Sequence, residues 1–292
     1  MPGFGDYTAE STLNWETGQA AMPALSARYL ALFTTPPADS GSGGTEVSGG
    51  SYARVQVAGS VSTNGTTASG NATLHFASVP AWIQPGMTVT DLTAPSVIPS
   101  GTTVLSTTST TVVMSANATG GGVGNGDSLQ FSAFPAASAS SGSEPDTLPA
   151  SVTNGSIVTF PTATADWGTV VAFGIFDAST SGNYLGGDYL GNYQWNPFTC
   201  SLASPGVLTV PANGYSNGDV VAVTEKYGGT LPTTGGSWAG LLTVANHTTD
   251  TFTAGVNTTS TGDGSVRKVL QQSIPNGVTA SFPASNLILT SA

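Results

Sequence analysis

The sequence predicts a mainly β fold: a discontinuous antiparallel β core, either a sandwich or a barrel, with a short N-terminal helix and two inserted small β-modules. The polar residues of this 292-residue chain are mostly Ser, Thr and Asn, and only 7% of all residues are charged. Short runs of β-branched and aromatic residues alternate with turns rich in Gly and Asn. Two Thr- and Ser-rich segments interrupt a background that is richer in aromatic residues.

The N-terminal segment is typical of a helix followed by a buried strand. Thr8 or Ser11 can cap a short helix with a weak apolar stripe, and Pro23 prevents the helix from continuing. Residues 26–34 then alternate between two faces that are both largely apolar. We therefore expect a strand that is covered on both sides.

Changes in composition divide the remaining chain. We expect a core built from residues 1–57, 151–202 and 268–292, inserted β-modules at residues 58–134 and 203–267, and a linker rich in Pro, Ala, Ser and Gly at residues 135–150. Each insert follows the order turn, strand, gap, strand, Thr-rich turn, strand. We interpret the inserts as related small sandwich-like or barrel-like units, with coincidence in Thr-rich sequence as the alternative.

Charge and cysteine content exclude several classes of protein. Five Lys and Arg against sixteen Asp and Glu give a net charge of −11, so binding to nucleic acid or to an anionic membrane surface is not expected. No apolar run of the length that spans a bilayer occurs. The first ten residues do not have the features of a signal peptide. The single cysteine, Cys200, cannot form a disulfide within the chain.

The core segments carry a recognisable pattern when the inserts are left out. The most specific part is the block from Thr45 to Arg54, followed in order by the block from Ala165 to Ala178. It resembles a family of tailed-bacteriophage virion proteins commonly labelled phage tail fibre proteins. The resemblance covers less than half of the chain: Leu13–Val57, Ser151–Cys200 and Lys268–Thr290.

The resemblance implies a structural protein on the exterior surface of a virion. Within that class the sequence favours a capsid decoration or cement protein, with a tail fibre or minor tail protein that contacts the host surface as the alternative. Its partners would be other phage structural proteins. We also expect a homo-oligomer, for instance a trimer, because such small β-modules leave strand edges and apolar patches for a partner to cover.

No motif indicates catalysis, a cofactor or a metal site. His75 and His247 lie in different inserts without a nucleophile motif, and the Cys and His residues lack zinc spacing. Asp166, Asp177 and Asp188 have aromatic neighbours, so a polysaccharide-degrading enzyme is a weaker alternative.

One aromatic group is the candidate contact site for a partner protein or a host glycan. Its members are Tyr184, Tyr189, Tyr193 and Trp195. Aromatic rings can stack on sugars and are enriched at protein–protein interfaces. Packing inside the core or at a subunit contact is the alternative role for these residues.

Overall fold

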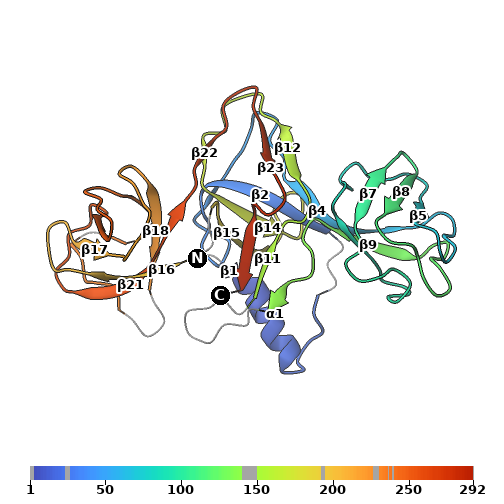
Figure 1. Ribbon diagram of the computed structural model, residues 1–292, viewed down its shortest axis with the longest axis horizontal. Helices are drawn as coiled ribbons and strands as arrows, with labels where there is room; N and C mark the ends of the chain where they lie inside the picture. Colours follow the sequence, from blue (N-terminus) through green and yellow to red (C-terminus); the bar gives the residue numbers. More distant parts are fainter. Residues whose placement is uncertain are drawn as a thin grey trace. The chain divides into compact units, whose positions relative to one another are not determined.

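The computed structural model describes residues 3–23, 27–139, 150–191, 195–225, 230–235, 237, 238 and 240–291. These residues form two compact units. Unit 1 contains the described parts of Met1–Ser140, Leu148–Asp188 and Ser273–Ala292, and unit 2 contains the described parts of Tyr189–Gln272. Both units consist of antiparallel strands, and one short helix lies near the N-terminus (Figure 1). The expected mainly β fold class is confirmed.

Unit 1 is built on a sheet of eight strands. Seven of them follow the order β1-β15-β14-β2-β4-β9-β6, and β3 pairs with β2. The elements of unit 1 are α1 (Asp6–Glu16), β1 (Gly3–Phe4), β2 (Ala27–Thr35), β3 (Thr45–Glu46), β4 (Val55–Ser62), β5 (Thr73–His75), β6 (Thr88–Asp91), β7 (Val104–Thr107), β8 (Thr111–Met114), β9 (Ser128–Ser132), β10 (Ser138–Ala139), β11 (Ala150–Thr153), β12 (Val158–Thr162), β13 (Thr169–Val170), β14 (Ala172–Phe176), β15 (Tyr184–Tyr189, whose last residue belongs to unit 2), β23 (Thr279–Phe282) and β24 (Ile288–Ser291).

Strand β2 lies in the middle of this sheet. Four consecutive residues, Leu30–Phe33, are buried, so both faces of the strand are covered. Its neighbour β14 is buried along its whole length and pairs with it antiparallel, Gly174 opposite Ala31. The two apolar faces of residues 26–34 follow from this central position.

Helix α1 begins earlier than its sequence indicates. Gly5 is the N-cap residue and no side chain caps the helix, so the expected cap at Thr8 or Ser11 is wrong. The Thr8 hydroxyl instead donates a hydrogen bond to the carbonyl oxygen of Leu185, 2.8 Å away, and fastens the helix to β15. Tertiary packing therefore decides where this helix begins.

The C-terminal segment of unit 1 pairs with the middle segment of this unit, Leu148–Asp188. Strand β24 pairs with β11, and β23 pairs with β12. Fully buried Asn154 secures this return: its Nδ2 donates to the carbonyl oxygens of Ser156 and Pro283, each at 2.8 Å, and its Oδ1 accepts from Leu287 N at 2.8 Å. Segments far apart in sequence thus form one core.

The first Thr-rich segment forms a small barrel within unit 1. Strands β6, β9 and β4 are adjacent in the large sheet, while β5, β8 and β7 form a second sheet. A bridge between Thr88 and Thr103 connects β6 to the start of β7, and Asn64 N donates to the His75 carbonyl oxygen at 2.8 Å next to β4 and β5. These links close a ring of six strands around the buried rings of Phe76 and Phe131.

Unit 2 forms a second ring of six strands. They are β16 (Asn196–Cys200), β17 (Val207–Thr209), β18 (Val220–Thr224), β19 (Leu241–Thr243), β20 (Thr251–Thr253) and β21 (Gly262–Val269). Their order is β19-β18-β21-β16-β17-β20, and a bridge between Ala245 and Thr253 joins the two ends. Leu208, Phe252 and Val266 are fully buried inside the ring. Strand β22 (Gln272–Ser273) lies at the boundary between the two units.

The two rings share one strand pairing. In the first, Leu74 of β5 lies opposite Val112 of β8. In the second, Leu208 of β17 lies opposite Phe252 of β20 in the same antiparallel register. Both pairs are fully buried.

The Thr-rich turns match as well. The hydroxyls of Thr108 and Thr111 are 2.7 Å apart, and those of Thr248 and Thr251 are 2.8 Å apart. In each turn the amide of the second threonine donates to the hydroxyl of the first at 3.0 Å. This agreement supports the interpretation of the inserts as related modules.

The strands that complete the rings begin before the expected insert boundaries. Strand β4 crosses the boundary between residues 57 and 58, and β16 ends before residue 203. The structure therefore differs from the expected division because closing each ring requires the strand that leads into it. Of the expected linker, residues 140–149 lie outside the described residues, and Ser138–Ala139 pair with β11.

Candidate functional site

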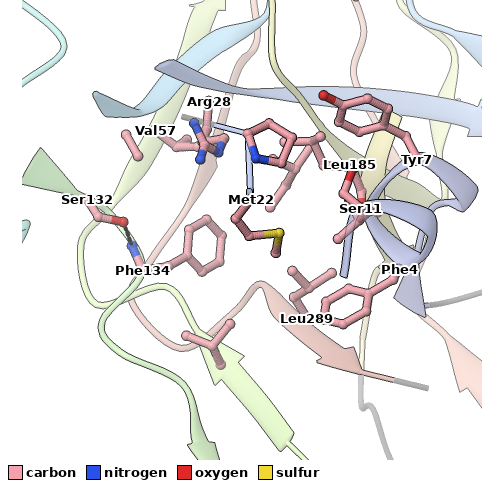
Figure 2. Close-up of a pocket in the computed structure, with 16 residues that line it drawn as sticks. Phe4, Tyr7, Ser11, Met22, Arg28, Val57, Ser132, Phe134, Leu185 and Leu289 are labelled. Carbon is pink, nitrogen blue, oxygen red and sulfur yellow. Dashed lines mark hydrogen bonds between the residues drawn. The ribbon is translucent and has the colours of Figure 1, made fainter. Parts of the chain in front are cut away.

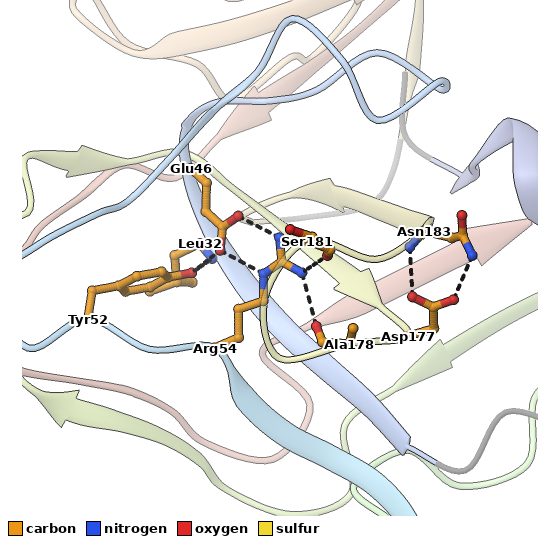
Figure 3. Close-up of polar contacts among 8 residues, drawn as sticks. All are labelled: Leu32, Glu46, Tyr52, Arg54, Asp177, Ala178, Ser181 and Asn183. Atoms are coloured by element: carbon orange, nitrogen blue, oxygen red, sulfur yellow. Dashed lines mark hydrogen bonds and ion pairs between the residues drawn. The ribbon is translucent and has the colours of Figure 1, made fainter.

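The sequence block that carries the family resemblance forms one polar network in unit 1. Arg54 and Glu46 form a bidentate ion pair, with 2.7 Å from Nη2 to Oε2 and 2.8 Å from Nε to Oε1. Nη1 of Arg54 also donates to the carbonyl oxygens of Ala178 and Ser181, at 3.0 and 2.7 Å (Figure 3). We call these residues, together with Tyr52, the Glu46–Arg54 network.

Aromatic rings surround this network. The Arg54 guanidinium carbon lies 3.6 Å from the centroid of the Phe176 ring, a close cation–π contact. The Tyr52 hydroxyl donates to Glu46 Oε1 at 3.0 Å and accepts from Leu32 N at 2.9 Å. Burial is the main cause that raises the pKa of Tyr52 far above its usual value, so the hydroxyl remains a donor near neutral pH.

The second sequence block packs against the first through Trp167. Its Nε1 donates to the Gly50 carbonyl oxygen at 2.9 Å, and its ring meets that of Tyr52 edge to face at 5.3 Å. Gly50 has φ +54°, and a Cβ there would lie 2.9 Å from the Trp167 nitrogen. The network therefore joins two distant core segments, and every group described here has a structural partner.

The candidate aromatic residues that the structure describes have different surroundings. Tyr184 belongs to unit 1, is 6% exposed and packs on Phe176. Tyr189 and Trp195 belong to unit 2 and are half-buried. Tyr193 lies outside the described residues.

Tyr189 and Trp195 flank one buried cation. The guanidinium carbon of Arg267, a residue that is 1% exposed, lies 5.1 Å from the Tyr189 ring centroid and 5.0 Å from that of Trp195. These rings therefore have a packing role, which the sequence analysis gave as the alternative. Their partner Arg267 could not be identified from the sequence because it is about seventy residues away. Their remaining exposed surface is what a ligand could contact.

The candidate acids and histidines occupy local structural roles. Asp166 accepts from Gly168 N at 2.8 Å, and Asp177 accepts from Asn183 N and Nδ2 at 2.7 and 2.8 Å. Asp188 is buried in β15. His75 pairs within its sheet, and His247 Nε2 lies 3.0 Å from Asn213 Oδ1.

In the described part of the chain, no group of three or more His, Cys, Asp or Glu residues could hold a metal ion. Likewise, none of the helices in that part is long and apolar enough to cross a membrane.

A pocket of about 300 Å³ lies beside α1 in unit 1 (Figure 2). Its walls are mainly apolar and come from α1, the strands of the large sheet and the C-terminal strand β24. Phe4, Phe134, Ile175 and Leu289 are among the apolar lining residues, and Arg28 is the charged one. No feature of the sequence indicated this pocket, because its walls come from segments that are distant along the chain.

The model of the family described as Podophage GP4 fiber I protein gp80 matches residues 3–133 and 101–193, which together cover well over half of the chain. No curated protein and no solved structure matches. The matched part contains the whole Glu46–Arg54 network, and most of unit 2 lies outside it.

Proposed function

The chain belongs to the family described as Podophage GP4 fiber I protein gp80, a fibre-type family of phage virion proteins, and on that basis we propose that it is a fibre subunit on the exterior of a tailed phage. The family match carries this proposal, and it supports the fibre alternative better than capsid decoration. The partners would then be other structural proteins of the virion.

The packing of unit 1 supports a role in which the protein withstands mechanical force. The Glu46–Arg54 network fixes two core segments to each other by charge-assisted hydrogen bonds, which are about twice as strong as neutral ones. We propose that the core of unit 1 attaches to the particle and that unit 2 is presented to the surroundings. The family match ends at residue 193, which supports unit 2 as an added module.

The test is the position of the chain on purified virions. Mass spectrometry of the particles should detect this chain in multiple copies, and gold-labelled antibodies raised against unit 2 should mark fibres. An antibody against the major capsid protein serves as the control. Absence from the virions would contradict the proposal, and label spread evenly over the head would favour capsid decoration instead.

Host-surface binding is a separable part of the proposal. We propose that the exposed edges of Tyr189 and Trp195 contact a host glycan, since aromatic rings stack on sugars. Trp195→Ala should weaken binding of unit 2 to host cells about tenfold, the scale of one lost aromatic contact. Leu202→Ala, at a residue that is 61% exposed in the same unit, is the matched control. Unchanged binding by a folded Trp195→Ala protein would remove the glycan contact and leave the fibre proposal intact.

A further inference from the structure

Six asparagines of this chain are followed directly by glycine. They are Asn64, Asn125, Asn154, Asn213, Asn217 and Asn276. In such a pair the glycine nitrogen can attack the side-chain carbonyl carbon of the asparagine, because glycine has no Cβ and leaves the backbone free to turn. The local structure of each pair decides whether this reaction is open to the folded protein.

In five of the six pairs the glycine amide already donates a hydrogen bond. Four glycines donate to backbone carbonyl oxygens at 2.7 to 3.1 Å: Gly126, Gly155, Gly218 and Gly277. Gly65 N donates to Asn125 Oδ1 at 2.8 Å. These amides must give up a hydrogen bond before their nitrogen atoms can attack.

Gly214, which follows Asn213, is the exception. It lies in the loop between β17 and β18, and its amide forms no hydrogen bond within the described part of the chain. Gly214 is exposed and has φ +64°, and apart from its chain neighbours no atom lies within 4 Å of the position that a Cβ would take. Its nitrogen is therefore free to turn toward the Asn213 side chain.

Two donors hold the side-chain carbonyl oxygen of Asn213. Tyr215 N donates to Oδ1 at 2.9 Å, and His247 Nε2 lies 3.0 Å from the same oxygen. Because Oδ1 can only accept, Nε2 is the nitrogen of the His247 ring that carries the proton. Two donors on one carbonyl oxygen form an oxyanion hole, which stabilises the negative charge that develops on Oδ1 when a nucleophile adds to Cγ.

We propose that Asn213 is a site of deamidation that the fold of unit 2 itself promotes. Gly214 N bonds to Cγ of Asn213 and gives up its proton, and the bond from Cγ to Nδ2 breaks. Nδ2 leaves with that proton as ammonia, and the product is a succinimide ring. Water then opens the ring at either carbonyl and gives aspartate or isoaspartate.

Most of the contacts around Asn213 persist during this reaction. Tyr215 N and His247 Nε2 remain on Oδ1, and only the hydrogen bond from Nδ2 to the Val210 carbonyl oxygen, 3.1 Å long, is lost with the ammonia. The reaction leaves a new carboxyl group beside His247, in a part of the chain that the family model does not match. The inference does not depend on the role in the virion.

Peptide mapping of the purified full chain by mass spectrometry tests the proposal. During storage at neutral pH, Asn213 should deamidate at least roughly five times faster than Asn217, because Gly218 N must first release the Val244 carbonyl oxygen. Asn217 is the internal control, since it is exposed and lies in the same loop. In urea the two sites should react at similar rates, because only the fold distinguishes them.

Substitution of His247 tests the oxyanion hole. His247→Ala removes one donor and should slow the reaction at Asn213 about tenfold, less than the loss of a donor from a buried enzyme site. His247→Gln offers an amide N–H and should restore most of the rate. Thr249→Ala, at an exposed residue near His247, is the matched control and should leave the rate unchanged. Circular dichroism verifies that each variant is folded.

Two results would overturn the inference. One is an Asn213 that reacts no faster than Asn217 in the folded wild-type protein, and the other is an unchanged rate at Asn213 in folded His247→Ala. If His247→Ala does not fold, the comparison of the two sites in the wild-type protein decides alone. Neither result bears on the virion test, which reads the location of the chain on the particle.

Discussion

Arg54 forms a bidentate ion pair with Glu46, 2.8 Å from Nε to Oε1 and 2.7 Å from Nη2 to Oε2. The two residues are eight positions apart, whereas the carbonyls that Arg54 also binds lie 124 and 127 positions further along the chain. One side chain thus completes a local ion pair and a long-range contact. The side chain of Arg54 is only 8% exposed, so solvent screens these interactions little.

Removal of this guanidinium should destabilise unit 1. Arg54→Ala leaves Glu46 and two carbonyl oxygens without their donor, and breaking a largely buried pair costs about 3–5 kcal/mol. Arg54→Lys should cost less but remain destabilising, because an ammonium cannot make the bidentate contact. Urea unfolding with unit-resolved hydrogen exchange measures both effects.

The matched control is the ion pair of Lys268 and Asp219 in unit 2. Its length is also 2.8 Å, but the lysine side chain is 40% exposed. Lys268→Ala should therefore lower the free energy of unfolding by less than about 1 kcal/mol. If Arg54→Ala proved as mild as Lys268→Ala, the structural importance of the Glu46–Arg54 network would be refuted.

Alkaline pH should weaken unit 1 through its buried tyrosines. Burial is the main cause that raises the pKa of Tyr52 and of Tyr184 above the ordinary value. In the unfolded chain a tyrosine ionises near pH 10, so the unfolded state releases its protons first as the pH rises. The stability that unit 1 gains from burying these protonated tyrosines is therefore complete below about pH 10. Above that pH it decreases by about 1.4 kcal/mol per pH unit for each tyrosine.

The ultraviolet absorbance of tyrosinate follows this ionisation directly. Part of the tyrosine signal should rise only together with unfolding of unit 1, and Tyr52→Phe should reduce that part. The same substitution should lower the free energy of unfolding by about 1–3 kcal/mol at neutral pH. The reason is that Leu32 N loses its acceptor and Glu46 loses a donor. Smooth titration of all tyrosines near pH 10 in the folded protein would contradict the expected burial.

The sequence predicted local strands well because their cues are local. Residues 26–34 have two largely apolar faces, and strand β2 lies there with Leu30–Phe33 buried. The cap of α1 was wrong because Thr8 bonds to a strand 177 residues away. The boundary at residue 58 differs because β4 serves both the core and the first ring.

In the candidate site too, the sequence pattern identifies some residues, whereas their contacts depend on the fold. The block from Thr45 to Arg54 could be identified by its pattern, but its partners at Ala178 and Ser181 become visible only in the folded chain. Tyr184 and Trp195 are close in sequence and have different roles, one buried in unit 1 and one beside Arg267 in unit 2. The pocket beside α1 has no sequence cue at all, because distant segments form its walls.

Cys200 should report the unfolding of unit 2. It is 4% exposed inside the second ring, and burial raises the pKa of its thiol, which lowers the fraction of reactive thiolate. A thiol reagent at neutral pH should therefore react slowly with the folded protein and rapidly in denaturant. Prompt reaction of the native protein would show that the ring opens easily or that the thiol is accessible.

Equivalent substitutions in the two rings should have equivalent, separate effects. Leu74 and Leu208 occupy the same position in the shared register and are both fully buried, so Leu74→Ala and Leu208→Ala should each cost about 2–5 kcal/mol. Hydrogen exchange should place the first loss in unit 1 and the second in unit 2. Leu105→Ala, at a residue 58% exposed on the first ring, is the control and should cost less than about 0.5 kcal/mol. If one leucine tolerated the change and the other did not, the shared register would not reflect equally packed cores, and the relation between the modules would be limited to their strand order.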